Sequence, residues 1–156
     1  QVGTTFCIYF PKAKESTALP AKPHPPLTIA RGKEVVLLVE DSDEVRKLIL
    51  DILEMQGYTV LAAHDGIEAL EIASNTQQKI DVLLTDVMMP QIDGKQVADQ
   101  LVDIMPHLKV IFMSGYSDQV IAKHGILETD MAFLQKPFTP TQLIHKIRQT
   151  LEEQGA

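Results

Sequence analysis

The feature of this sequence that most constrains its fold is a short apolar run followed by an amphipathic segment. Val35-Val36-Leu37-Leu38-Val39 contains no polar residue, which is typical of a strand buried on both faces of a parallel sheet. Ser42 is placed to cap a helix that Gly57 would end. The apolar residues of that helix fall on one predicted face, namely Val45, Leu48, Ile49, Ile52 and Leu53. The pattern therefore begins as a strand followed by a helix.

The same alternation continues to the end of the chain. Further strands are predicted over 58–62, 80–85, 108–113 and 131–134, and amphipathic segments follow each of them. The stretch 117–124 is only weakly helical, whereas Thr139-Pro140-Thr141-Gln142 is a strong signal for the start of the last helix. Strands that alternate with helices imply right-handed crossovers and one parallel sheet covered on both sides. We expect an α/β fold, a three-layer αβα sandwich of flavodoxin-like (βα)5 type with strand order 2-1-3-4-5.

The chain divides into three regions by composition. Residues 4–10 are β-branched and aromatic and predict a strand, whereas 12–33 are rich in proline and predict an extended linker. Residues 34–154 carry the regular alternation and form the predicted main domain. Because the chain begins at Gln1 rather than Met, we expect a piece of a longer polypeptide.

Charge and cysteine content limit the possible functions. Residues 1–33 carry five basic residues and one acidic residue, a net charge of +4. Because the whole chain has a net charge of −7, residues 34–156 carry −11. Such an acidic body argues against binding of nucleic acid or of an anionic membrane. Cys7 is the only cysteine, which excludes a disulfide framework and favours a reducing, cytoplasmic location.

Chemically capable residues follow four of the predicted strands. Glu40-Asp41, Asp86, Ser114 and Lys136 lie where the first, third, fourth and fifth strands end, and the carboxyl ends of parallel strands form the ligand-binding edge of such sheets. Clustered carboxylates repel one another, and a hard divalent cation, Mg²⁺ or Mn²⁺, would offset that repulsion. A carboxylate can also attack phosphorus, and Asp86 is the most central of the acids. Each residue alone has an ordinary explanation as a cap, a turn or a surface charge; the joint placement favours phosphoryl acceptance by Asp86.

The segment 34–154 resembles the receiver domain of bacterial two-component response regulators. The motifs that carry the resemblance are the acidic pair Glu40-Asp41, the run Leu84–Pro90 around Asp86 with Gly94, the hydroxyl of Ser114, and Lys136-Pro137-Phe138. The resemblance implies phosphotransfer from a phosphohistidine, carried by a histidine-kinase dimerisation domain or a histidine phosphotransfer protein. It also implies a phosphoacceptor that is not a classical enzyme.

The resemblance assigns a role to each residue of the site. Asp41, Asp86 and the backbone carbonyl of Met88 would contact Mg²⁺, and Glu40 would act through a metal-bound water. Glu40 stands where the family often has Asp, which puts the detailed geometry in doubt. Ser114 and Lys136 would hold the phosphoryl oxygens, Phe133 matches the switch aromatic, and Met88 and Tyr116 would flank the site.

The first eleven residues carry a second resemblance. Gly3–Pro11 is similar to the closing strand of histidine-kinase ATP-binding domains, which suggests the carboxyl-terminal part of a hybrid sensor histidine kinase whose parent protein can be membrane-anchored. The alternatives are a stand-alone response regulator, an aspartyl-phosphate phosphohydrolase, a flavin-binding module and an inert pseudo-receiver. A phosphohydrolase of this kind usually has a second acid two residues after the nucleophile, but Met88 occupies that position. A flavin-binding module usually has a Ser/Thr- and Gly-rich phosphate loop after the first strand, and this sequence has none there. Both observations count against these alternatives.

Overall fold

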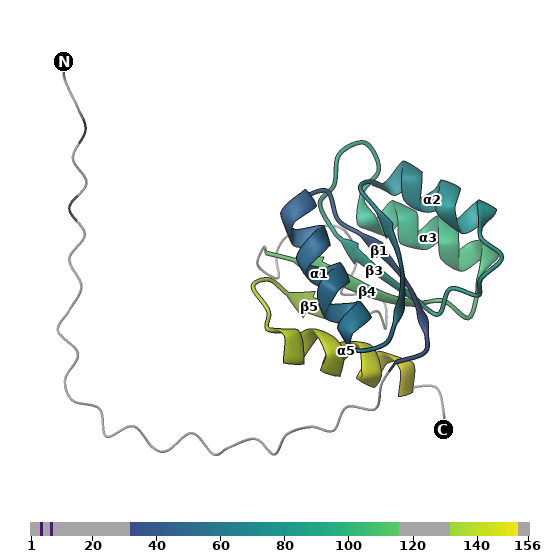
Figure 1. Cartoon of the computed structure of the whole chain (residues 1–156). Coiled ribbons are helices and arrows are strands. Elements are labelled where there is room, and N and C mark those ends of the chain that lie inside the picture. Colours follow the sequence, from purple (N-terminus) through teal and green to yellow (C-terminus); the bar gives the residue numbers. More distant parts are fainter. Residues whose placement is uncertain (1–3, 5–6, 8–31, 116–131, 153–156) are drawn as a thin grey trace.

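The computed structural model describes Thr4, Cys7 and residues 32–115 and 132–152. Residues 32–115 and 132–152 form a sheet with helices on both sides (Figure 1). The order along the described chain is β1 (Val35–Val39), α1 (Asp43–Met55), β2 (Thr59–Ala63), α2 (Gly66–Asn75), β3 (Val82–Asp86), α3 (Gly94–Ile104), β4 (Lys109–Ser114), β5 (Ala132–Gln135) and α5 (Pro140–Glu152). The strands are parallel and ordered β2-β1-β3-β4-β5, so the predicted architecture is confirmed. The helix predicted over 117–124 lies outside the described residues.

The helix ends show how local sequence sets the boundaries. Asp93 caps α3 in a reciprocal capping box with Gln96, and Thr139 and Gln142 exchange equivalent hydrogen bonds at the start of α5. Gly57 adopts a φ of 93° just after α1, a left-handed conformation that only glycine reaches without cost. Ser42 occupies the capping position of α1, but its side chain makes no capping hydrogen bond.

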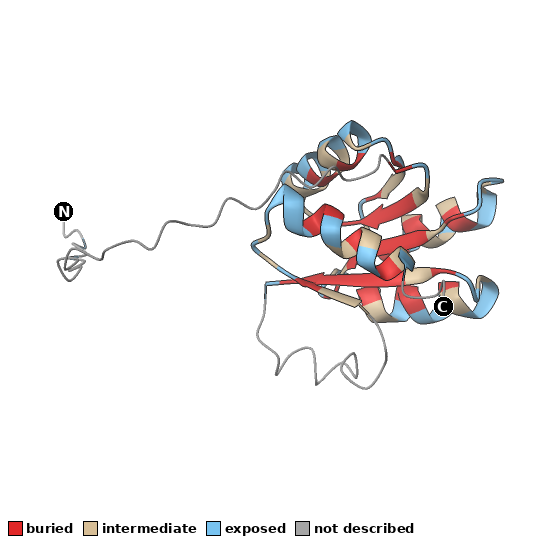
Figure 2. Cartoon of the chain, turned by 90° about the horizontal axis from the view of Figure 1, so that it is seen from below, coloured by how far each residue is buried: buried red, intermediate tan, exposed pale blue. Residues whose placement is uncertain are grey.

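The two faces of the sheet pack against different helices (Figures 1 and 2). One core includes Leu37, Leu83 and Phe112 with residues of α2 and α3, and the other includes Leu38, Ile111 and Met113 with residues of α1 and α5. The strands are buried from both sides, as the apolar run at 35–39 predicted. The apolar positions predicted to share one face of α1 do so at Val45, Leu48, Ile49 and Ile52, which line one surface groove, where Leu48 is 60% exposed.

The register brings the ends of the strands to one edge. Val39 of β1 pairs with Thr85 of β3, and Asp86 pairs with Met113 of β4. Ser114, the last residue of β4, pairs with Gln135, which ends β5. Residues that follow these strands are therefore neighbours in space, although up to 96 positions separate them in the chain.

The amino-terminal region is described at two positions only. Thr4 and Cys7 are exposed and belong to neither a helix nor a strand. The rest of the strand predicted over 4–10, and the predicted linker up to residue 31, lie outside the described residues. Within the part that is described, no helix is both long and apolar enough to cross a membrane.

Candidate functional site

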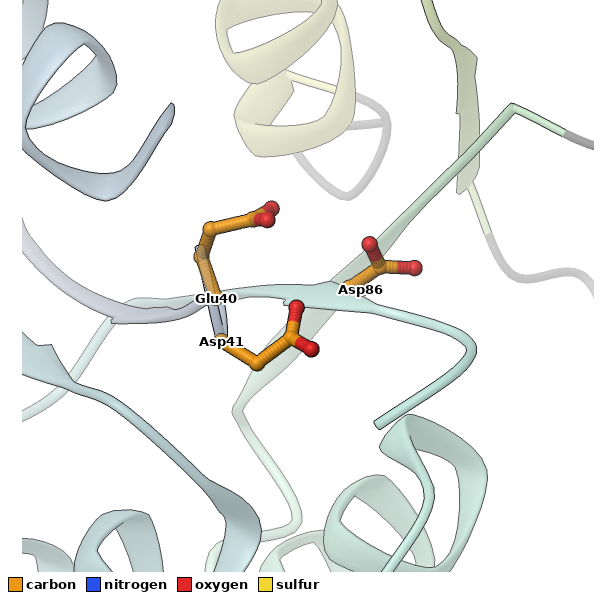
Figure 3. Close-up of side chains that lie close together, drawn as sticks. All are labelled: Glu40, Asp41 and Asp86. Carbon is orange, nitrogen blue, oxygen red and sulfur yellow. The ribbon is translucent and has the colours of Figure 1, made fainter. Parts of the chain in front are cut away.

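Three carboxylates meet at the carboxyl edge of the sheet. Glu40 and Asp41 directly follow β1, and Asp86 ends β3; one oxygen of each lies within 4.8 Å of one oxygen of the others. Figure 3 shows the three side chains close together, with the carboxylates of Glu40 and Asp41 on the side of Asp86. Glu40 is only 2% exposed and Asp41 is exposed. The structure therefore brings together the three acids that the sequence predicted to converge.

Lys136 joins two of these acids. Its ammonium nitrogen lies 2.6 Å from Oε2 of Glu40 and 2.7 Å from Oδ2 of Asp86. The residue follows β5, where its backbone N–H donates to the carbonyl of Ser114 over 2.8 Å. We refer to Glu40, Asp41, Asp86 and Lys136 together as the acidic edge.

Burial and charge shift the titration of the acidic edge. Burial raises the pKa of Glu40 above its ordinary value; the hydrogen bond from Lys136 opposes that rise, and the Asp86 carboxylate adds to it. For Lys136, burial acts to lower the pKa, but the two carboxylates outweigh it and the pKa is raised. The ammonium group is therefore held in its charged form beside Asp86.

The loop after β3 fixes the position of Asp86. The backbone N–H of Met88 donates to Oδ1 of Asp86 over 3.1 Å, so both carboxylate oxygens have a partner. The hydroxyl of Thr85 donates to the Asp86 carbonyl over 3.0 Å. Gly94 lies so close to this carbonyl that an added Cβ would be 1.9 Å from the oxygen. Only glycine fits there, because the atom that would have to move is backbone.

Ser114 and Phe133 lie on the same face of the sheet. Ser114 is 1% exposed at the end of β4, and Phe133 is half-buried on β5, where it pairs with Phe112 and packs against the core on the α2 and α3 side. Because side chains alternate along a strand, Ser114 and Phe133 point to the same side. Tyr116 lies outside the described residues.

The family model for the response regulator receiver domain matches residues 36–148. The chain belongs to the response regulator receiver family. It is 36% identical, over 97% of its length, to the sensor kinase CckA of Brucella abortus, of which it spans 17%. It is also 31% identical to the response regulator receiver protein CpdR of the same organism, over 74% of this chain and 95% of that protein. The chain is a receiver domain of two-component signal transduction.

Solved structures agree with this assignment. The crystal structure of the receiver domain from the hybrid histidine kinase CckA matches at a TM-score of 0.63 with 37% identity, over 75% of this chain and 98% of that one. A receiver domain protein from Clostridium thermocellum matches at a TM-score of 0.69 with 29% identity, over 77% of this chain and 95% of that one.

The acidic edge of this receiver domain suits a divalent cation. Oxygen ligands of an octahedral Mg²⁺ lie about 3 Å apart when they are adjacent, so carboxylates within 4.8 Å of one another can share an ion with small movements or an intervening water. Asp41 is exposed, and its carboxylate lies near that of Asp86. The carboxylate of Glu40 is bound to Lys136 through Oε2, a contact that the sequence did not predict.

Two parts of the receiver site were missed from the sequence. Arg46 donates from Nη1 to the carbonyl of Glu40 over 2.8 Å and so holds the acidic pair in place; a basic residue one turn into the helix after the pair was the available signal. The second part is an apolar groove of about 480 Å³ beside Lys136. Its lining residues are Val45, Leu48, Ile49, Ile52, Lys136, Pro137, Phe138 and Pro140.

Proposed function

We propose that Asp86 is the phosphoacceptor of this receiver domain and that Asp41, Asp86 and the carbonyl of Met88 hold Mg²⁺ or Mn²⁺. The observation that carries the proposal is the central position of Asp86. Its carboxylate contacts Lys136 on one oxygen and the N–H of Met88 on the other, and it lies within 4.8 Å of the carboxylates of Glu40 and Asp41.

The chemistry follows from these contacts. A carboxylate oxygen of Asp86 attacks the phosphorus of a phosphohistidine; the new O–P bond forms as the P–N bond breaks, and the imidazole leaves with both bonding electrons. When bound, the divalent cation supplies neutralisation of charge on the phosphoryl oxygens. Lys136 is already beside Asp86 and takes up a phosphoryl oxygen, and Ser114 donates its hydroxyl to another. Water later attacks the same phosphorus and restores the carboxylate.

The conformational output is proposed to start from Ser114. Movement of its hydroxyl toward the phosphoryl group leaves space on the face that it shares with Phe133, and the half-buried ring can then turn inward. Phosphorylation thereby shifts the population between two arrangements. The surface that reports the change would include β5 and α5, together with the predicted helix at 117–124.

The groove beside Lys136 suits a donor helix that carries a phosphohistidine next to apolar side chains. Leu48 is 60% exposed in this groove, and the groove reaches Lys136 at the acidic edge. We expect Leu48→Glu to slow transfer from a histidine-phosphorylated dimerisation domain by about tenfold or more. Labelling by acetyl phosphate should stay within about twofold of the wild type. Met55→Glu is the matched control, since Met55 is exposed on the same helix but does not line the groove.

The parent polypeptide is proposed to be a hybrid sensor histidine kinase that works in the cytoplasm. The match to a sensor kinase over 97% of the chain includes residues before the receiver domain, which supports a kinase as the parent. The proposed divisions are a final ATP-domain strand at 1–11, a linker at 12–33 and the receiver at 34–154. The phosphohydrolase alternative gains no support, because Met88 offers Asp86 a backbone N–H rather than an acidic side chain.

The test is intact-mass analysis after incubation with acetyl phosphate and Mg²⁺. The wild-type chain should gain one phosphoryl group, and Asp86→Asn should gain none. Equal gain by both proteins would remove Asp86 from its proposed role. Failure of the wild type to gain a phosphoryl group would support an inert pseudo-receiver.

A further inference from the structure

The chain enters the receiver domain through a fixed segment, Gly32–Glu34, which we call the entry segment. Its first residue, Gly32, is buried, and its N–H donates to the carbonyl of Gln56, just after α1, over 2.9 Å. A Cβ added at Gly32 would lie 2.5 Å from carbons of the Tyr58 ring, and Tyr58 is itself only 4% exposed. Because a larger residue would displace a buried ring, the backbone is held closely against the domain where the chain enters it.

The last residue of the entry segment is joined to α5. Oε1 of Glu34 accepts from Nη1 of Arg148 over 2.8 Å, and the other carboxylate oxygen, Oε2, accepts from the backbone N–H of Lys33 over 2.8 Å. The carboxylate thus joins a side chain of α5 to the backbone of the entry segment. A displacement of Arg148 would therefore also move that backbone.

Helix α5 connects the entry segment with the acidic edge. It begins at Pro140, which lines the same groove as Lys136, and Arg148 lies about 12 Å further along the helix. The buried residues of α5 between these points share one core with Tyr58, namely Leu143, Ile144 and Ile147. A packed helix of this length moves as a rigid element, so movement of its first turn would reach Arg148.

We propose that Arg148 and Glu34 couple the phosphorylation state of Asp86 to the conformation of the chain that precedes residue 32. When Lys136 takes up a phosphoryl oxygen, the start of α5 is drawn with it, and Arg148 changes its hold on the entry segment. Coupling between two sites is reciprocal, so displacement of the entry segment would in turn alter the stability of the phosphorylated state. The inference rests on the proposed function of Asp86 and extends its output from β5 and α5 to the preceding part of the polypeptide.

Hydrogen exchange measured by NMR tests the coupling in the full chain. The Gly32 amide reports on the entry segment because its N–H is bonded to Gln56. The Asp81 amide, bonded to the carbonyl of Val35 at the same end of the sheet, is the internal reference. Beryllofluoride with Mg²⁺ serves as the mimic of a bound phosphoryl group, and we expect it to change exchange at Gly32, relative to Asp81, about fivefold or more.

Two variants separate the ion pair from general effects of charge. Arg148→Met removes the ion pair but leaves an unbranched apolar side chain beside the Tyr58 ring, so the change at Gly32 should fall below about twofold. Lys79→Met is the matched control, because Lys79 forms its ion pair with Asp81 at the same end of the sheet, and it should respond as the wild type does. If Arg148→Met does not fold, Glu34→Gln should reduce the response by about half or more.

Three results would overturn the inference: a wild-type chain that is labelled at Asp86 but shows no change at Gly32 beyond that at Asp81, an undiminished change in Arg148→Met, or an equal loss in Lys79→Met. Where Glu34→Gln replaces Arg148→Met, an undiminished change in that variant has the same meaning. Failure of the underlying function is distinct, because the wild type would then gain no phosphoryl group from acetyl phosphate, or Asp86→Asn would gain one.

Discussion

The two ends of the sheet both carry partly buried charges, but they balance them differently. At the carboxyl end, the acidic edge sets three carboxylates against the single ammonium group of Lys136. At the amino end, before β1 and β2, Glu34 pairs with Arg148 over 2.8 Å. The Arg148 guanidinium lies 5.2 Å from the centre of the buried Tyr58 ring. We call Glu34, Tyr58 and Arg148 the base cluster.

The pKa shifts follow the same division. Burial acts to raise the pKa of Glu34, but hydrogen bonds from backbone N–H groups and from Arg148 outweigh it, and the pKa is lowered. For Glu40 at the acidic edge, burial outweighs the hydrogen bond from Lys136, and the pKa is raised. The base cluster stabilises its carboxylate, as structural ion pairs do, whereas the acidic edge carries three carboxylates and one ammonium group, an excess of negative charge that is typical of sites for cations. The comparison teaches that charge balance, rather than burial alone, separates the two ends.

The largest effect on stability is expected from removing Arg148. Arg148→Ala leaves Glu34 without its cation and uncovers the Tyr58 ring, so the free energy of unfolding should fall by about 2 kcal/mol, as measured by urea denaturation. Lys79→Ala is the control: Lys79 pairs with Asp81 but is 68% exposed, so its loss should cost less than about 0.5 kcal/mol. Equal effects from the two variants would show that the base cluster has no special structural role.

At the acidic edge, removing a charged side chain is expected to raise the free energy of unfolding rather than lower it. Asp86→Asn relieves repulsion with Glu40 and Asp41, so in metal-free buffer at neutral pH the variant should be more stable than wild type by about 1 kcal/mol. Mg²⁺ at ten times its dissociation constant should stabilise the wild type by about 1.4 kcal/mol and the variant by much less. A destabilised Asp86→Asn protein, or equal stabilisation of both by Mg²⁺, would contradict the view that this edge is unbalanced.

The smallest effect expected is a dependence on pH at the base cluster. Because the folded-state pKa of Glu34 is lowered, its stabilisation is present above the unfolded pKa and is lost as pH falls through the folded one. Glu34→Gln should therefore cost on the order of 1 kcal/mol at pH 7; this deficit should shrink as pH falls below the unfolded pKa of about 4.3 and disappear below the lowered folded pKa. The exposed Glu71→Gln serves as control. A Glu34→Gln deficit that persists unchanged in acid would refute the assignment.

Much of this fold could be predicted from the sequence because each element carries a local signal. The run Val35–Val39, the glycine after α1 and the Thr139–Gln142 capping box each specify structure within a few residues. Boundaries were less certain: the third strand was predicted over 80–85 but spans Val82–Asp86. Ile80 is buried outside the strand, so burial alone does not indicate where pairing begins.

The candidate site was predictable as a set of residues but not as a set of contacts. Strand ends and family motifs indicated Asp41, Asp86 and Lys136, whereas the hydrogen bond from Lys136 to Glu40 joins residues 96 positions apart and depends on side-chain length in three dimensions. Periodicity likewise placed Leu48 on the apolar face of its helix, but it did not indicate that this face forms a groove in which Leu48 is exposed. Such features depend on how neighbouring elements pack, which local patterns do not encode.

The most direct test of the account is to locate the phosphoryl group in the wild-type chain. Borohydride reduces an aspartyl phosphate to homoserine, and peptide mass analysis after acetyl phosphate treatment then identifies the modified position. We predict homoserine at position 86 and at no other acidic residue of the acidic edge. Modification at Asp41 or Glu40, or at a residue outside this edge, would contradict the central claim that Asp86 is the acceptor.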